Sequence, residues 1–257
     1  MGQKLVILTG VSSSLGKAIA DSLLRDTKFV VVATSRRPEL EIDWLQQALS
    51  DFPSRLHYYK ADLSIQQEVF GLRTFVRRLS DSVASIVHAA GGTKNFARFS
   101  ELAPEDWMRA YEDNVISAVN MVSIFSDDLF SAGESSVLLI GSVAASEPGE
   151  MNPHYSTSKA ALANLCKYLS RLYGLRGVRV NLLTLGPIDS GMWAEKNGIR
   201  AEERIVETVR AAEEQIPLGK IGESGDIASA VAILIQEPFQ WMTGAEIKLD
   251  GGKSRAI

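Results

Sequence analysis

The chain has 257 residues, of which 46% are hydrophobic and 23% are charged, and its formal net charge is −4. This composition is typical of a globular protein, and the negative balance offers no basic field to attract nucleic acid or an anionic membrane. The single cysteine excludes a disulfide framework, the three scattered histidines argue against a metal site, and no apolar run is long enough for a signal peptide or a membrane span. We therefore expect a cytoplasmic protein.

Short apolar runs alternate with longer amphipathic segments. The runs that we predict as strands are Lys4–Thr9, Phe29–Thr34, Leu56–Tyr59, Ser85–Ala89, Val137–Ile140, Val178–Leu183 and Ala245–Leu249. The segments that we predict as helices are Leu15–Arg25, Trp44–Leu49, Ile65–Leu79, Pro104–Phe130, Tyr155–Tyr173 and Gly225–Ile235. Several strands are rich in Val, Ile and Leu without alternation, so both faces of the sheet should be covered. This order predicts one α/β domain with a Rossmann-like, doubly wound, parallel seven-stranded sheet.

A turn rich in glycine and serine joins the first predicted strand to the first predicted helix. Backbone N–H groups at such a helix start attract a pyrophosphate, and small side chains allow it to approach closely. Gly10 would form the turn, and Gly16 would allow the helix to pack against the strand. The residues that we expect to bind a dinucleotide here are Gly10, Ser12, Ser13, Ser14, Leu15 and Gly16. The alternative is an ordinary loop that caps a helix.

Two arginines follow the second predicted strand. An enzyme that binds NAD would carry an acidic residue at the end of this strand for the ribose 2′-hydroxyl. Here no acidic residue lies between the strand and Glu39. The guanidiniums of Arg36 and Arg37 suit a 2′-phosphate, which they can bind bidentately. We therefore predict NADP(H) over NAD(H), the alternative being two solvated arginines.

The ends of the third and fourth predicted strands complete the expected cofactor site. Asp62, which precedes Leu63, can accept a hydrogen bond from an adenine amino group, and its alternative role is to cap the following helix. Ala90 and Gly91 are small enough for a flat cofactor to lie against the edge of the sheet. His88 is expected to be structural.

Three side chains form a complete set for carbonyl chemistry. Tyr155 and Lys159 lie one helical turn apart, and Ser142 lies upstream of them. A phenol can donate a proton, a neighbouring ammonium can lower its pKa, and a hydroxyl can hold the substrate oxygen. The set predicts reversible reduction of a carbonyl to a secondary alcohol by hydride transfer.

The segment from Ile188 to Pro217 is long for a connection between two strands. Long connections at the carboxyl end of a strand in an open α/β sheet often close over a ligand. We expect a substrate lid here, and a pair of solvated helices is the alternative.

The motifs described above occur in an order that resembles the short-chain dehydrogenase/reductase family, and the resemblance covers essentially all 257 residues. They are Thr-Gly-x3-Ser-x-Gly from Thr9, Ala-Ala-Gly from Ala89, Asn114 in a helix, Ser142, Tyr155-x3-Lys159 and Gly186-Pro187. Near the C-terminus, Pro217-Leu-Gly-Lys-Ile-Gly and the segment from Thr243-Gly to Asp250-Gly-Gly look like the branch that contains 3-oxoacyl-acyl-carrier reductases.

The resemblance implies roles for the candidate residues. Tyr155 would be the general acid in reduction and the base in oxidation, Lys159 would hold the nicotinamide ribose, and Ser142 would bind the carbonyl oxygen. Asn114 would support a water that links Lys159 to solvent. Pro187 and Ile188 would border the nicotinamide. The resemblance also implies a homo-oligomer, a tetramer or a dimer, built on the helices Pro104–Phe130 and Tyr155–Tyr173.

The chain departs from the family pattern at three places. Ser14 replaces the usual second glycine, which narrows the room for the phosphates. Ser13 stands where many NADP-binding members carry a basic residue. His88-Ala89 replaces the usual Asn-Asn, which removes an amide hydrogen bond beside the cofactor.

The expected substrate pocket combines apolar and small polar residues, from Thr93–Phe96, Val143–His154 and Met192–Trp193. It has no paired arginines, so a neutral or largely apolar carbonyl compound is the first expectation. A 3-oxoacyl-carrier-protein substrate is the alternative. Arg171 could meet an acidic carrier, whereas Asp127, Asp128 and Glu134 would repel it. A non-catalytic NADP(H)-binding sensor or scaffold is a further alternative, which the intact catalytic set disfavours.

Overall fold

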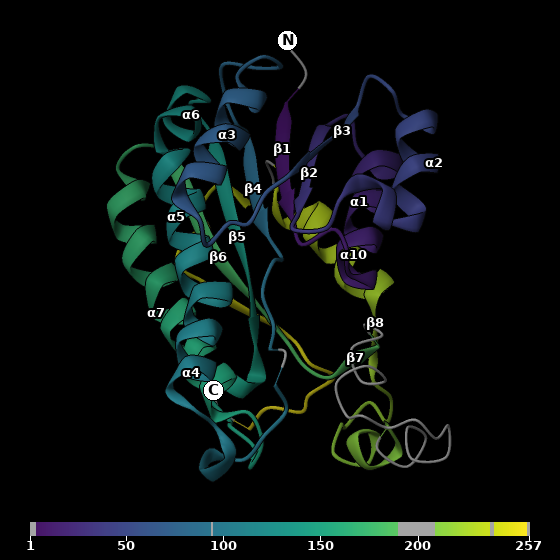
Figure 1. Ribbon diagram of the computed structural model, residues 1–257, viewed down its shortest axis with the longest axis vertical. Helices are drawn as coiled ribbons and strands as arrows, with labels where there is room; N and C mark the ends of the chain where they lie inside the picture. Colours follow the sequence, from purple (N-terminus) through teal and green to yellow (C-terminus); the bar gives the residue numbers. More distant parts are fainter. Residues whose placement is uncertain (1–3, 94, 190–208, 237–238, 256–257) are drawn as a thin grey trace.

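Figure 1 shows a computed structural model of the chain, which describes residues 4–93, 95–189, 209–236 and 239–255. Seven parallel strands form one sheet in the order β3-β2-β1-β4-β5-β6-β9. The strands are β1 (Leu5–Thr9), β2 (Val30–Ser35), β3 (Leu56–Lys60), β4 (Ser85–His88), β5 (Ser135–Ser142), β6 (Val178–Leu185) and β9 (Glu246–Leu249). The predicted doubly wound, seven-stranded sheet is confirmed.

Helices cover both faces of this sheet. They are α1 (Ser14–Asp26), α2 (Asp43–Asp51), α3 (Gln66–Val76), α4 (Pro104–Tyr111), α5 (Ser117–Ile124), α6 (Ser126–Ser131), α7 (Pro153–Gly174) and α10 (Ser224–Leu234). Helices α1, α2 and α10 lie on one side, and α3 to α7 lie on the other (Figure 1). None of the described helices combines the length and apolar composition that crossing a membrane requires.

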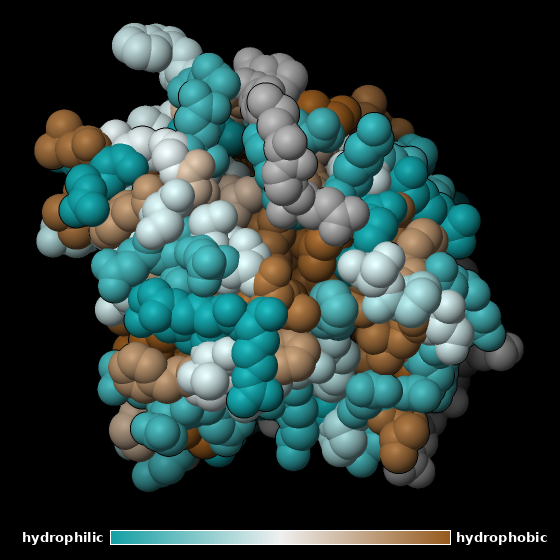
Figure 2. Space-filling view, turned by 90° about the horizontal axis from the view of Figure 1, so that it is seen from above, coloured by the Kyte–Doolittle hydropathy of each residue, from teal (hydrophilic) through white to brown (hydrophobic). Residues whose placement is uncertain are grey.

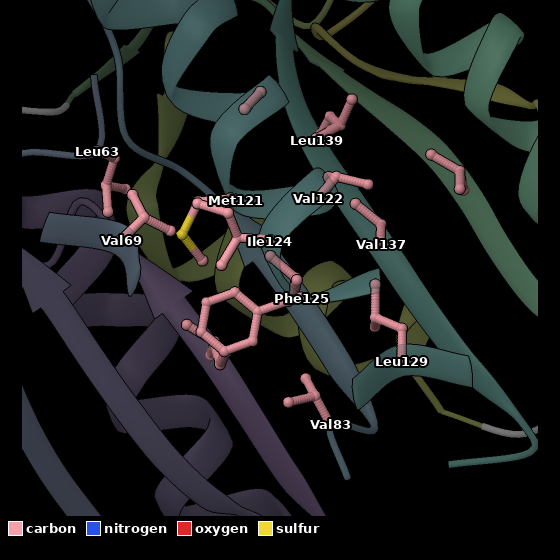
Figure 3. Close-up of a cluster of buried hydrophobic side chains, with 14 of the residues drawn as sticks. Leu63, Val69, Val83, Met121, Val122, Ile124, Phe125, Leu129, Val137 and Leu139 are labelled. Carbon is pink, nitrogen blue, oxygen red and sulfur yellow. The ribbon is translucent and has the colours of Figure 1, made fainter. Parts of the chain in front are cut away.

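Each face of the sheet has its own buried core. Figure 3 shows the core beneath α3, α5 and α6, where Phe125 and Met121 pack near Val137 of β5. On the opposite face, Ile19 of α1 and Val231 of α10 are fully buried against the strands. Burial on both faces explains why the central strands β1 and β2 are almost continuously apolar in sequence.

The predicted helix Pro104–Phe130 is wrong as a single helix. A π-helical turn, η3 (Glu112–Ile116), separates α4 from α5, and α6 begins after a break at Phe125. Within the turn, the side-chain amide of Asn114 donates to the carbonyl of Ala110 at 2.8 Å. In an α-helix the carbonyl of Ala110 would accept from the backbone N–H of Asn114. The Asn114 side chain competes for this carbonyl, which is consistent with the wider π-helical turn.

The site is formed at the end of the molecule where the strands finish. Figure 2 views the opposite end, where hydrophilic residues cover most of the surface and hydrophobic ones occur singly or in small groups. At the carboxyl end, a separate parallel pair forms between β7 (Ile188–Asp189) and β8 (Gly222–Glu223). Most of the predicted lid, together with Met192–Trp193, lies outside the described residues.

Candidate active site

The glycine- and serine-rich turn lies tightly against the ends of β1 and β4. Gly10 has a φ of +79°, and a Cβ on it would lie 2.7 Å from the carbonyl oxygen of Ala89. A Cβ on Gly16 would lie 2.3 Å from the carbonyl oxygen of Gly10, so Gly16 packs against the turn rather than against the strand itself. The Ser13 hydroxyl accepts from the N–H of Gly16 and donates to the carbonyl of Gly10, at 3.0 and 2.9 Å. Small residues at these places fix the N-terminus of α1 beside the site.

Two adjoining cavities lie at this end of the sheet. The first, of about 450 Å³, brings together most of the residues that were predicted to bind the cofactor. Those that line it are Gly10, Ser12, Ser13, Arg36, Arg37, Asp62, Leu63, Ala90 and Gly91. Leu15, Tyr155, Lys159, Pro187 and Ile188 line the second cavity, whereas Ser14 and Gly16 line neither. Ser13, Ala89 and Gly91 belong to both, so a long ligand could run from one into the other.

The two predicted phosphate-binding arginines differ in their surroundings. The Arg36 Nη1 lies 2.7 Å from the Asp113 Oδ1, in an ion pair with the π-helical turn. The Arg37 side chain is exposed and forms no ion pair with the residues that the structure describes. Only one of the two guanidiniums is therefore free of a competing carboxylate.

Asp62 does not cap the helix that follows it, so that alternative is wrong. Its Oδ1 accepts from the N–H and the hydroxyl of Ser64, at 3.0 and 2.7 Å, and forms a local turn. Helix α3 begins later, after Ile65, without a side-chain cap. The carboxylate of Asp62 lines the first cavity, as an adenine-binding role would require.

His88 is a neutral, buried connector beneath the cavities. The Ser117 hydroxyl donates to the carbonyl of Asp113 at 2.8 Å, so it accepts from the His88 Nε2 at 3.2 Å. In the neutral ring the Nδ1 is then an acceptor, so the Thr9 hydroxyl donates to it at 3.3 Å and itself accepts from the N–H of Ala90 at 2.9 Å. Burial lowers the pKa of His88 to about 3, and the nearby Lys159 ammonium acts in the same direction. The imidazole therefore supplies bracing where the sequence analysis expected a lost amide bond.

Asn114 fixes the loop after β4. Its Oδ1 accepts from the N–H of Gly92, and its Nδ2 donates to the carbonyl of the same residue, both at 2.8 Å. A Cβ on Gly91 would lie 2.5 Å from that Oδ1, so only glycine allows the loop to approach so closely. These side-chain bonds hold the loop at Gly91 and Gly92 in place. Since Gly91 lines both cavities, Asn114 fixes part of the wall that they share.

Ser142, Tyr155 and Lys159 meet at the wall of the second cavity, as the sequence predicted. Ser142 ends β5, and the other two lie on the first turns of α7. The Lys159 Nζ donates to the carbonyl of Ile140 at 2.8 Å and lies 5.8 Å from the centre of the Tyr155 ring. The ammonium is nearly buried, with 5% of the residue exposed.

The pKa of the Tyr155 phenol moves opposite to the direction expected from the neighbouring ammonium. Burial raises this pKa above its usual value, and the hydrogen bond with Ser142 opposes the rise. The expectation of a lowered pKa is therefore wrong for the chain alone. Tyr155 stays protonated at neutral pH.

The second cavity, of about 320 Å³, contains the part of the predicted substrate pocket that is described. Thr93, Phe96 and Met151 line it, and Lys159 is the only charged residue among the described ones that do. At its rim, Asn152 has a φ of 59° and a ψ of 47°, an uncommon conformation for a residue other than glycine. Hydrogen bonds with the backbone of Ala97, at 2.8 and 3.1 Å, hold Asn152 in place just before α7.

Two residues of the site, Asp113 and Thr9, were not predicted as such from the sequence. Asp113 was not recognised because its partner, Arg36, is 77 positions away in the chain. Thr9 was predicted as the end of a strand and the start of the glycine motif, but without a role for its hydroxyl, which bridges the N–H of Ala90 and the ring of His88. A polar side chain at the last position of a buried strand was the available signal for Thr9, whereas Asp113 gave none.

Known proteins resemble this chain along nearly its whole length. A family model described as enoyl-(acyl carrier protein) reductase matches residues 10–254. Carbonyl reductase family member 4 of Danio rerio is 28% identical over 250 residues, which make up 97% of this chain and 97% of that protein. Dehydrogenase/reductase SDR family member 4 of Pongo abelii is 26% identical over 259 residues, covering 98% of this chain and 88% of that protein.

A solved structure agrees with this result. It is the NADPH-bound structure of a short chain oxidoreductase from Pseudomonas aeruginosa PAO1 that contains an atypical catalytic center. The two chains share 25% sequence identity and superimpose with a TM-score of 0.89, over 99% of this chain and 98% of the other.

Proposed function

This chain belongs to the short-chain dehydrogenase/reductase family of oxidoreductases, and we propose that it reduces a ketone or other carbonyl compound to a secondary alcohol, reversibly, with NADP(H). The observation that carries this proposal is the position of Tyr155. Its phenol is hydrogen-bonded to Ser142, lies beside the buried ammonium of Lys159, and borders the second cavity, which adjoins the first. Simple binding of a nucleotide would not require that arrangement.

The residues present fit a nicotinamide dinucleotide. Gly10 and Gly91 line the first cavity, and the absence of a side chain lets their loops pack closely against Ala89 and Asn114. The N-terminus of α1 favours a pyrophosphate, and Arg37 is available for a 2′-phosphate. Pro187 and Ile188 line the second cavity, where the nicotinamide would lie. The bound cofactor would supply or accept the hydride.

Tyr155 would act as the general acid in reduction. Because burial raises its pKa, the phenol holds its proton at neutral pH and can give it to the carbonyl oxygen as that oxygen gains negative charge. Ser142 would hold the same oxygen by its hydroxyl. Lys159 would bind the nicotinamide ribose and stabilise the tyrosinate that remains, and Asn114 would support the water that returns a proton.

The substrate would be neutral or largely apolar. The described wall of the second cavity offers aromatic and aliphatic surface from Phe96, Val143 and Met151, with Thr93 as a small polar group. No described residue there would neutralise a substrate carboxylate or phosphate except Lys159, which we assign to the cofactor.

A 3-oxoacyl thioester on a carrier protein is the second candidate, because the matching family model is described as enoyl-(acyl carrier protein) reductase, a name that also points to an acyl chain on a carrier protein. Charge repulsion by Asp128 does not count against this candidate. Asp128 was expected to repel an acidic carrier, but its carboxylate is 1% exposed and is bound by Arg73 and Arg77 at 2.6 and 2.7 Å. It therefore presents no free charge to a partner.

Turnover of a Tyr155→Phe variant tests the proposal. Purified protein is mixed with NADPH and a panel of ketones and 3-oxoacyl thioesters, and oxidation of the cofactor is followed by absorbance. General acid catalysis contributes about 10²–10⁴-fold, so this variant should be slower by that factor on the best substrate while it still binds NADPH. Tyr168→Phe, on the exposed face of the same helix, is the matched control and should keep the wild-type rate. A Tyr155→Phe variant with the wild-type rate would show that the proposed mechanism is wrong.

A further inference from the structure

The cavity that would hold the adenosine end of the cofactor has an unusual balance of charge. Its described lining carries two guanidiniums, on Arg36 and Arg37, and three carboxylates, on Glu41, Asp62 and Asp113. A pocket that selects a phosphate dianion would be expected to have an excess of positive charge. Two arginines after the second strand therefore do not by themselves make this pocket a strong 2′-phosphate site.

Asp113 is the carboxylate that acts on Arg36 directly. The two side chains are 2.7 Å apart, and the exposed fraction is 42% for the arginine side chain and 10% for the aspartate side chain. The pair is thus asymmetric, since the guanidinium reaches solvent and the carboxylate does not. If Arg36 bound a 2′-phosphate instead of Asp113, the Asp113 carboxylate would stay mostly buried without an ion-pair partner, which is unfavourable.

The backbone around Asp113 prevents the carboxylate from withdrawing. The backbone carbonyl of Asp113 accepts from the Ser117 hydroxyl at 2.8 Å. The next residue, Asn114, forms two hydrogen bonds with the backbone of Gly92, through its side-chain Oδ1 and Nδ2. The π-helical turn therefore holds the Asp113 side chain at the wall of the cavity. A phosphate that shared Arg36 with Asp113 would lie close to a second negative charge, which repels it.

We propose that Asp113 is a specificity-determining residue that weakens recognition of the 2′-phosphate by neutralising Arg36, so that Arg37 carries most of the preference for NADP(H). This inference rests on the proposed function. It assigns the two arginines unequal roles, although they are adjacent and identical in type.

Calorimetric binding of two nucleotides tests the role of Asp113. Adenosine 2′,5′-bisphosphate and 5′-AMP differ only in the 2′-phosphate. The ratio of the dissociation constant of 5′-AMP to that of the bisphosphate therefore measures recognition of this phosphate. Asp113→Asn should increase the ratio by about tenfold, which corresponds to about 1.4 kcal/mol. Glu112→Gln is the matched control. It removes the same charge from the same turn, but Glu112 faces Arg109 at 3.8 Å and does not line the cavity, so the ratio should stay within about twofold.

Arginine variants provide an independent test, which decides the matter if Asp113→Asn does not fold. Arg37→Ala should reduce the ratio by about tenfold or more. Because Arg36→Ala alone would leave the Asp113 charge without its partner, the comparison is made with Arg36→Ala/Asp113→Ala, which removes both charges of the pair and should keep the ratio within about threefold of wild type. Equal losses for the two, a larger loss for Arg36→Ala/Asp113→Ala, or a folded Asp113→Asn variant whose ratio is unchanged or lower would overturn the inference and leave the proposed function intact. If wild-type protein binds neither nucleotide nor NADPH, the proposed function itself is wrong and the inference falls with it.

Discussion

Replacing His88 should make the protein less sensitive to acid. The imidazole is completely buried between Thr9 and Ser117, and burial lowers its pKa to about 3 from the usual value of 6.5. In the folded state it is neutral at pH 5, whereas in the unfolded chain most of it is protonated at that pH. The unfolded state therefore binds more protons, and stability is lost as the pH falls from 6.5 toward 3.

The size of the effect follows from these two values. Each pH unit inside this window changes the free energy of unfolding by about 1.4 kcal/mol, and little changes between pH 7 and 6.5. Between pH 7 and pH 5, His88 should therefore reduce the free energy of unfolding by about 2 kcal/mol. His88→Asn removes this contribution, because an amide does not titrate, while it can still form hydrogen bonds with the two neighbouring hydroxyls.

Urea unfolding at pH 7 and pH 5, at one protein concentration, provides the measurement. The difference between the two pH values should be smaller in His88→Asn than in wild type by about 2 kcal/mol, whatever the variant costs in overall stability. His57 and His154 also have lowered pKa values because of burial, but they are the same in both proteins and cancel in the comparison. Equal acid sensitivity in the two proteins would refute the assignment of His88 as a neutral buried group.

Three further results are expected. Alcohol oxidation should accelerate as the pH rises above neutral, because the proposed base is the tyrosinate of Tyr155 and burial raises the pKa of this phenol; a flat profile up to pH 10 would argue against this base. Replacing Arg36 and Arg37 together with Ala should weaken NADPH binding about 10-fold or more and leave NADH binding nearly unchanged, and equal losses for both would contradict the predicted preference. The protein should be an oligomer, because Ile116 near α5 and Tyr168 on α7 leave apolar side chains exposed, and light scattering that gives the mass of one chain at all concentrations would show otherwise.

The sequence predicts the central strands well because they contain local apolar runs. The runs around Ile7 and Val32 are buried on both faces, so their composition alone identifies them. The long helix before β5 was predicted less well. The widened turn at Asn114 results from a side-chain bond to Ala110, which the hydrophobic period does not reveal.

The site was predictable where its chemistry follows the order of the chain. Tyr155 and Lys159 are one turn apart on one helix, so their proximity is local. The pairing of Arg36 with Asp113 and the bridging of Thr9 to Ser117 by His88 depend on contacts between distant segments, and no local pattern encodes them. The lowered pKa expected for Tyr155 was wrong for a similar reason, because burial of the phenol is a property of the folded cavity.

Transfer of a label tests the central claim most directly. NADPH that carries deuterium at its transferable position is incubated with wild-type protein and the best carbonyl substrate from the panel, and the alcohol is analysed by mass spectrometry and NMR. We expect deuterium on the carbinol carbon, delivered to one face only, and slower formation of the same product by Tyr155→Phe. An alcohol without deuterium at that carbon, or label delivered equally by wild type and Tyr155→Phe at equal rates, would contradict hydride transfer with Tyr155 as the acid.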